Sequence, residues 1–137
     1  MNGTEGFTLI EMIVVLAVLG LVGSVILSRG PMHSPTLELR VAAQDMAVTM
    51  RDGRMGAIVT ARPAIFTANA GQGRYGMEGS PGHVLRHGAI LSGNATLVFH
   101  PDGSVTGRAV TLLRGGRRIT LVANALTGSV ALREGVP

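Results

Sequence analysis

The chain has 137 residues, and its twelve basic side chains, all arginine, outnumber eight acidic ones to give a net charge of +4. This modest positive charge permits an anionic partner without requiring one. The absence of cysteine excludes a disulfide framework and a thiolate metal site. Twenty glycines, with only three phenylalanines and one tyrosine, predict many turns and short strands around an aliphatic core.

An almost wholly apolar run extends from Phe7 to Leu27. As a helix this run would span roughly 31 Å, which matches a bilayer hydrocarbon core of about 30 Å. No charged residue lies between Met12 and Ser28, but Glu11 stands near the start of the run. A carboxylate costs roughly 2.5–3.5 kcal/mol at the bilayer centre and less near its edge. Glu11 is therefore a candidate functional residue.

Three simpler interpretations of the apolar run give Glu11 no function. A cleavable secretory signal would begin with basic residues, and residues 1–6 contain no lysine or arginine. A buried helix of a soluble protein would not contain so long an uncharged stretch. A plain membrane anchor explains the length of the run but leaves Glu11 unexplained.

The six residues GFTLIE, from Gly6 to Glu11, resemble the cleavage and methylation motif of type IV pilins and type II secretion pseudopilins. The resemblance implies that a prepilin peptidase cuts between Gly6 and Phe7 and that Phe7 is then N-methylated. It also implies a role in subunit assembly for Glu11, which would meet the terminal amine of a neighbouring subunit in a fibre. Such pairing would compensate two charges that are costly in lipid.

The resemblance divides the chain into a leader peptide, residues 1–6, and a transmembrane and assembly helix, residues 7–29. Two prolines then predict a kink near residues 30–35. The expected location is the inner membrane, crossed once, with the C-terminal domain in the periplasm. The fold class expected is α+β and pilin-like: a long hydrophobic helix, then a second helical half packed on an antiparallel β-sheet domain.

Residues 36–61 predict a second, amphipathic helix, with Thr36 as its N-terminal cap and the Arg62-Pro63 pair at its end. Apolar side chains recur at three- and four-residue spacings and predict the buried face of this helix, with two methionines beside it. The residues are Leu37, Val41, Val48, Met55 and Ile58 for the face, and Met46 and Met50 for the flank.

Residues 62–137 predict a β-rich domain. The expected strands are 64–68, 83–85, 89–91, 96–99, 108–113, 117–123 and a last one around Val130 and Leu132. A glycine-rich mobile loop is expected over residues 69–82. Asp102 belongs to a PDG turn, and Gly115-Gly116 predicts a tight hairpin.

The region from Phe99 to Val130 is similar to the C-terminal part of the H-type minor pseudopilin of type II secretion and of related type IV minor pilins. In that family a strand, a PDGS-like turn, an apolar strand, a hairpin and a TG turn follow in this order. The resemblance implies a minor pseudopilin that assembles near the tip of a periplasmic pseudopilus. Its partners would be other minor and major pseudopilins, the prepilin peptidase, the inner-membrane assembly platform and, before assembly, membrane lipid.

Motifs for catalysis, cofactors and metals are weak, and we expect no enzyme, cofactor or metal site. The segment GQGRYG, residues 71–76, matches GxGxxG, but the glycines and proline that follow it cannot open the helix that a phosphate site requires. His83, His87 and His100 have no cluster of carboxylates beside them.

Three arginines surround the predicted hairpin tip: Arg114, Arg117 and Arg118. They are candidates for contact with an anion or with an acidic partner subunit. A type IV minor pilin that touches DNA through phosphates during uptake is the alternative function. Stacking aromatic residues are absent from the cluster, which argues against recognition of single-stranded nucleic acid.

Overall fold

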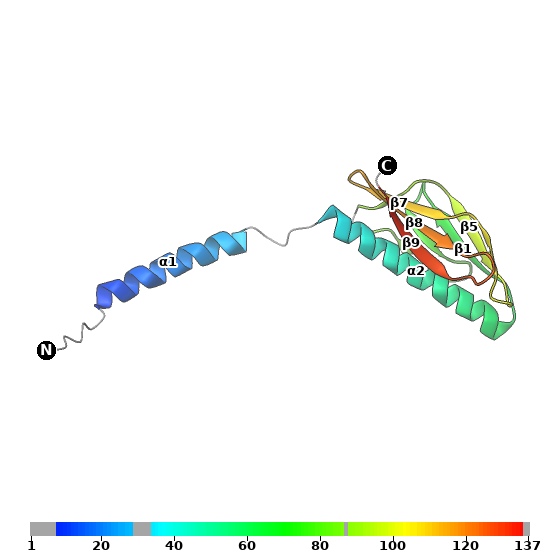
Figure 1. The fold of residues 1–137 in the computed structure, drawn as a ribbon, viewed down its shortest axis with the longest axis horizontal. Helices are drawn as coiled ribbons and strands as arrows, with labels where there is room; N and C mark the ends of the chain where they lie inside the picture. Colours follow the sequence, from blue (N-terminus) through cyan, green and yellow to red (C-terminus); the bar gives the residue numbers. More distant parts are fainter. Residues whose placement is uncertain (1–7, 29–33, 87, 136–137) are drawn as a thin grey trace. The chain divides into compact units, whose positions relative to one another are not determined.

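The computed structural model describes residues 8–28, 34–86 and 88–135, and the chain divides into two units, Met1–His33 and Ser34–Pro137. Within the described residues, the first unit contains helix α1 (Leu9–Ser28), and the second contains helix α2 (Pro35–Thr60) followed by nine strands (Figure 1). This order of elements confirms the predicted α+β, pilin-like arrangement. The predicted kink near residues 30–35 falls mainly on residues outside the described part of the chain.

Helix α2 begins one residue earlier than expected. Ser34 is its N-cap, with no hydrogen bond from the side chain, and Pro35 occupies the first turn, where its missing N–H is not needed. The predicted capping role of Thr36 is therefore wrong. The helix ends at Thr60, and its C-cap is Ala61, which has a left-handed φ of 52° and whose N–H bonds to the carbonyl oxygen of Ala57.

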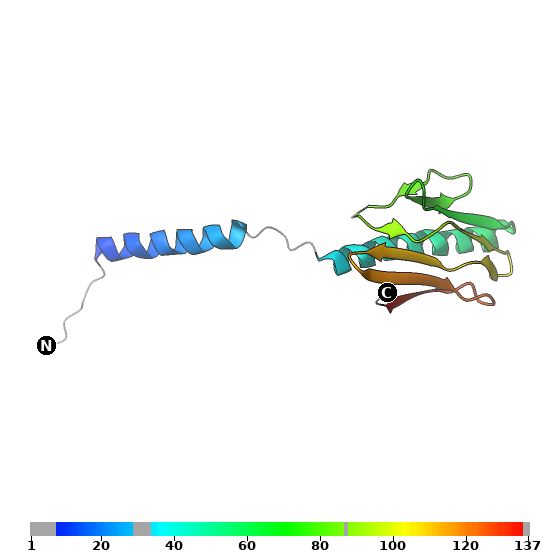
Figure 2. The ribbon, with the colours of Figure 1, turned by 90° about the horizontal axis from the view of Figure 1, so that it is seen from above.

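The strands form two antiparallel sheets on the same side of α2 (Figures 1 and 2). The five-stranded sheet has the order β3-β2-β1-β5-β6, and the four-stranded sheet has the order β4-β7-β8-β9. The strands of the first sheet are β1 (Ala64–Asn69), β2 (Arg74–Met77), β3 (His83–Val84), β5 (Ala95–Phe99) and β6 (Val105–Gly107). Those of the second are β4 (Ile90–Leu91), β7 (Val110–Arg114), β8 (Arg117–Ala123) and β9 (Val130–Gly135).

Two strands lie where no strand was predicted, and several others differ from the predicted bounds by one or two residues. Strand β2 lies inside the region expected to be a mobile loop and pairs with β1 from Phe66–Met77 to Asn69–Arg74. Strand β6 was not expected as a separate element and pairs with β5. In both cases an existing neighbour strand supplies the hydrogen-bonding partner, and this outweighs the low strand propensity of glycine.

The turns follow their sequence signals. Gly115 and Gly116 have φ values of 53° and 73°, as a two-residue hairpin turn between β7 and β8 requires. In the PDG turn, the carboxylate of Asp102 accepts hydrogen bonds from the backbone N–H and the hydroxyl of Ser104, at 2.9 and 2.6 Å. These bonds lower the pKa of Asp102. Asp102 is thus a turn-forming residue, as predicted.

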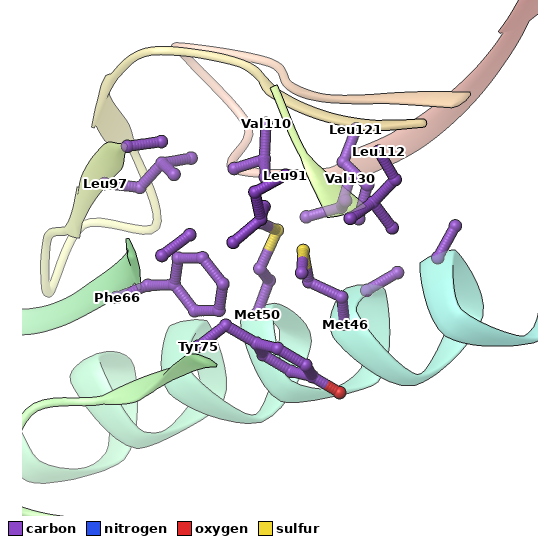
Figure 3. Packing of buried hydrophobic residues seen from close by; sticks show 14 of the residues in the cluster. Met46, Met50, Phe66, Tyr75, Leu91, Leu97, Val110, Leu112, Leu121 and Val130 are labelled. Atoms are coloured by element: carbon purple, nitrogen blue, oxygen red, sulfur yellow. The ribbon is translucent and has the colours of Figure 1, made fainter. Parts of the chain in front are cut away.

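The hydrophobic core lies between α2 and both sheets. Met46 and Met50 project from α2 toward Phe66 on one side and toward Leu112, Leu121 and Val130 on the other (Figure 3). Every buried core residue belongs to the Ser34–Pro137 unit. This unit therefore has a core of its own and meets the physical requirement for folding without α1.

The buried face of α2 is not the predicted one. The buried residues are Leu39, Ala42, Ala43, Met46, Ala47, Met50, Gly53 and Ala57. Leu37, Val48, Met55 and Ile58 are exposed instead, and Val41 is only partly covered. Small side chains let the helix approach the sheets closely, so alanine and glycine line the contact and the two methionines fill the remaining gaps. Met46 and Met50 pack in the core as expected, but the prediction that they flank the row of Leu37, Val48 and Met55 is wrong, because they lie on the opposite side of the helix.

Candidate functional site

Helix α1 is long and apolar enough to cross a membrane by its length and composition. Its 20 residues span about 30 Å, and none of the residues from Leu9 to Ser28 is buried. A helix with no polar face is stable only where lipid or protein surrounds it. Helix α1 therefore fits a membrane anchor.

Glu11 lies in the first turn of α1. Its backbone N–H bonds to the carbonyl oxygen of Thr8 at 3.0 Å and approaches the Thr8 hydroxyl at 3.4 Å. Thr8 and Glu11 thus have the spacing of a capping box, and an acid in a first turn also interacts favourably with the helix dipole. Glu11 has a local role in starting the helix, which must be distinguished from a role toward a partner subunit.

Glu11 shares one face of α1 with three valines. Val15, Val18 and Val22 follow Glu11 at spacings of four, seven and eleven residues and therefore share its side of the helix. The carboxylate is thus the single acidic group on an apolar face that begins in the first turn of α1. Gly6 and Phe7, the predicted cleavage and methylation residues, lie outside the described residues and remain predictions.

The arginine cluster at the β7–β8 hairpin divides into two parts. Arg114 forms an ion pair with Glu38 in the first turn of α2, and the two side chains are only 24% and 13% exposed. Arg117 and Arg118 are exposed and extend the hairpin tip. Arg114 therefore fastens the hairpin to α2, and Arg117 and Arg118 carry the accessible charge. Sequence analysis missed Glu38, whose place near the helix start could have indicated a structural partner.

The GxGxxG segment does not form a phosphate-binding turn. Residues 71–76 lead into strand β2, with no helix after the glycines. His83 stacks on Tyr75, with ring centroids 5.4 Å apart, and Nε2 of His100 lies 3.2 Å from the Thr106 hydroxyl. His87 lies outside the described residues. Both described histidines thus have partners that explain their positions without a metal.

A groove lies between α2 and the β2–β3 region. Its walls include Asp45, Asp52, Tyr75, His83 and Arg86. Burial raises the pKa of the Tyr75 hydroxyl, and the charge of Asp45 adds to this effect, while Arg86 opposes it. The groove therefore presents two carboxylates and one guanidinium around an aromatic wall.

Comparison with known proteins places the anchor in a recognised class. Residues 1–27 match the family described as the prokaryotic N-terminal methylation motif. No curated protein and no solved structure matches the chain. The match covers residues 1–8 and most of α1, and it supports a pilin-like family for the chain. A prepilin-type motif of this kind implies processing by a prepilin peptidase and assembly with other pilins.

Proposed function

We propose that the chain is an H-type minor pseudopilin of the type II secretion system, a structural and non-catalytic subunit near the tip of the periplasmic pseudopilus. In this role it takes part in the export of folded proteins across the outer membrane. The observation that carries the proposal is the GFTLIE motif, whose last three residues begin α1, together with the α+β domain that follows. In this proposal α1 crosses the inner membrane once before assembly, with residues 34–137 in the periplasm.

The C-terminal order of elements supports the resemblance to minor pseudopilins and to the related type IV minor pilins. Strand β5 ends at a PDGS turn, and β7 and β8 form the hairpin that precedes the TG turn at Thr127-Gly128. Strand β9 then closes the second sheet. This is the order that sequence similarity to the H-type minor pseudopilin and to related type IV minor pilins predicts, although β6 adds a short strand to it.

Mass spectrometry of the mature chain tests the pilin-type processing on which the proposal depends. We expect a chain that begins at Phe7 and carries one added methyl group on its terminal amine. Replacing Gly6→Leu should block cleavage and leave Met1 in place, because the peptidase must accept the residue before the cut. Gly3→Leu changes another leader glycine and should be processed normally.

An unprocessed wild-type chain, or one cut elsewhere, would contradict this assignment. It would favour a third class, a simple membrane-anchored domain that does not assemble.

A type IV minor pilin that contacts DNA is the second candidate function. The observation that favours it is the exposure of Arg117 and Arg118 at a hairpin tip, where phosphates could reach both. In a gel-retardation assay the 34–137 fragment would then bind duplex DNA in a salt-sensitive manner. Arg117→Ala/Arg118→Ala should reduce the salt-dependence slope by about 2, while the exposed pair Arg62→Ala/Arg108→Ala should change it less. Absence of binding would leave the secretion subunit as the better assignment.

A further inference from the structure

The outward face of α2 carries an apolar stripe of its own. Leu37, Val48, Met55 and Val59 are 59%, 51%, 57% and 74% exposed, and Val41 lies in line with them. Val41, Val48 and Met55 recur every seven residues, which keeps them on one side of the helix. We call these five residues the outer stripe.

The outer stripe lies opposite the core. Leu39, Met46 and Met50, all 1% exposed or less, occupy the other side of α2 against the two sheets. In Figure 1 both sheets lie on one side of α2, so the stripe faces away from the β layer. An apolar row of this length exceeds the scattered exposed residues that a monomer normally shows.

Acidic residues flank one edge of the outer stripe. Asp45 and Asp52 are seven residues apart on the edge that borders the groove toward β2 and β3. Arg86 lines the same groove and His83 stacks on Tyr75 there, so the two carboxylates are balanced by one guanidinium. With two carboxylates against one guanidinium, this edge has an excess of negative charge.

Arginines flank the opposite edge, which borders β9. Arg40 and Arg51 line a shallow groove there with Glu134. Arg40 forms an exposed ion pair with Glu134 at 2.7 Å, and Arg51 donates to the carbonyl oxygen of Val130 at 3.4 Å. Two guanidinium groups against one carboxylate give this edge an excess of positive charge.

These opposite edges decide how two outer stripes can meet. If two α2 helices pack face to face in parallel, the acidic edge of each lies beside the arginine edge of the other. If they pack antiparallel, acidic edge meets acidic edge and arginine edge meets arginine edge, which is repulsive. A valine at two of the three heptad positions also suits a parallel pair. A bilayer surface would fit the stripe poorly, because anionic lipid repels the acidic edge.

We propose that the outer stripe is a docking surface for the α2 helix of a second copy of this chain, packed in parallel and in register. Asp45 and Asp52 of each copy then lie beside Arg40 and Arg51 of the other. The contact rests on α2 alone and is independent of cleavage at Gly6 and of the type of fibre.

Single cysteines in the 34–137 fragment test the direction of packing, since the natural chain has none. Val41→Cys and Met55→Cys lie on either side of Val48 within the stripe. A parallel pair in register should cross-link each variant to itself under mild oxidation, because disulfides form only when Cβ atoms approach to about 4 Å. Leu126→Cys, exposed in the loop after β8, is the collision control. Cross-links only between the two different variants would show antiparallel packing. A cross-linked fraction no higher than that of Leu126→Cys would overturn the proposal that the outer stripe is a docking surface.

Charge reversal tests the two edges, with the Val41→Cys cross-link as the readout. Asp45→Arg/Asp52→Arg makes both edges basic, and Arg40→Asp/Arg51→Asp makes both acidic. Each variant alone should cross-link about tenfold less than the unchanged fragment, while an equimolar mixture should recover cross-linking. Recovery also shows that both variants are folded. Arg108→Asp, between β6 and β7, should leave cross-linking unchanged, and loss without recovery in the mixture would overturn the proposal.

Discussion

Replacing Glu11→Ala is expected to leave membrane insertion intact, or improve it, and to reduce incorporation into the fibre by about 100-fold or more. Insertion improves because a carboxylate is removed from an apolar helix. Incorporation falls because, under the proposed processing, the terminal amine of Phe7 would be buried without a charged partner. Breaking a buried ion pair from one side costs about 3–5 kcal/mol, and each 1.4 kcal/mol corresponds to a tenfold change.

The local role of Glu11 requires a matched variant. Glu11→Gln keeps the spacing of the capping box with Thr8 but removes the charge. If the carboxylate pairs with a neighbouring amine, Glu11→Gln should assemble as poorly as Glu11→Ala. Val15→Ala, on the same helix face, should assemble nearly normally. The measurement is the fraction of each variant recovered in sheared fibres compared with the fraction in membranes, and normal assembly of Glu11→Gln would leave only the capping role.

Sequence alone predicted the α+β order because its signals are local. A long uncharged run, prolines near its end, and glycine turns at Gly103 and Gly115 each act within a few residues. Strand β2 was not predicted because its stability depends on pairing with β1. The glycine-rich sequence of β2 does not itself indicate this pairing.

Helix α2 shows where the pattern itself was ambiguous. The helix has two apolar faces, and its sequence periodicity predicts that the row with larger aliphatic side chains faces the core. The structure buries the alanine-rich row around Met46 and Met50 instead, because a close helix–sheet contact favours small residues. The spacing of apolar residues correctly identified an apolar row on α2, but spacing alone does not show whether the core or another surface covers that row. The same limit applies to the hairpin arginines, where only the fold shows that Arg114 is held by Glu38.

Phe66 is expected to be the most sensitive position in the domain core. It is fully buried at the centre of β1, between β2 and β5, and its ring lies 6.2 Å from that of Tyr75 and beside Met50 (Figure 3). Phe66→Ala removes most of a large side chain that the surrounding strands cannot replace by collapse. We expect the free energy of unfolding of the 34–137 fragment to fall by about 3–5 kcal/mol.

Urea denaturation followed by circular dichroism measures this loss. A domain of this size has about 5–15 kcal/mol of stability in total, so Phe66→Ala could leave too little folded protein for a complete curve. Phe66→Leu retains most of the volume and should cost less than about 1.5 kcal/mol, which keeps the comparison measurable. Leu126→Ala, at a side chain that is 85% exposed, should change stability by less than about 0.5 kcal/mol. Equal losses for Phe66→Ala and Leu126→Ala would mean that the ring of Phe66 does not hold α2 and the two sheets around one core.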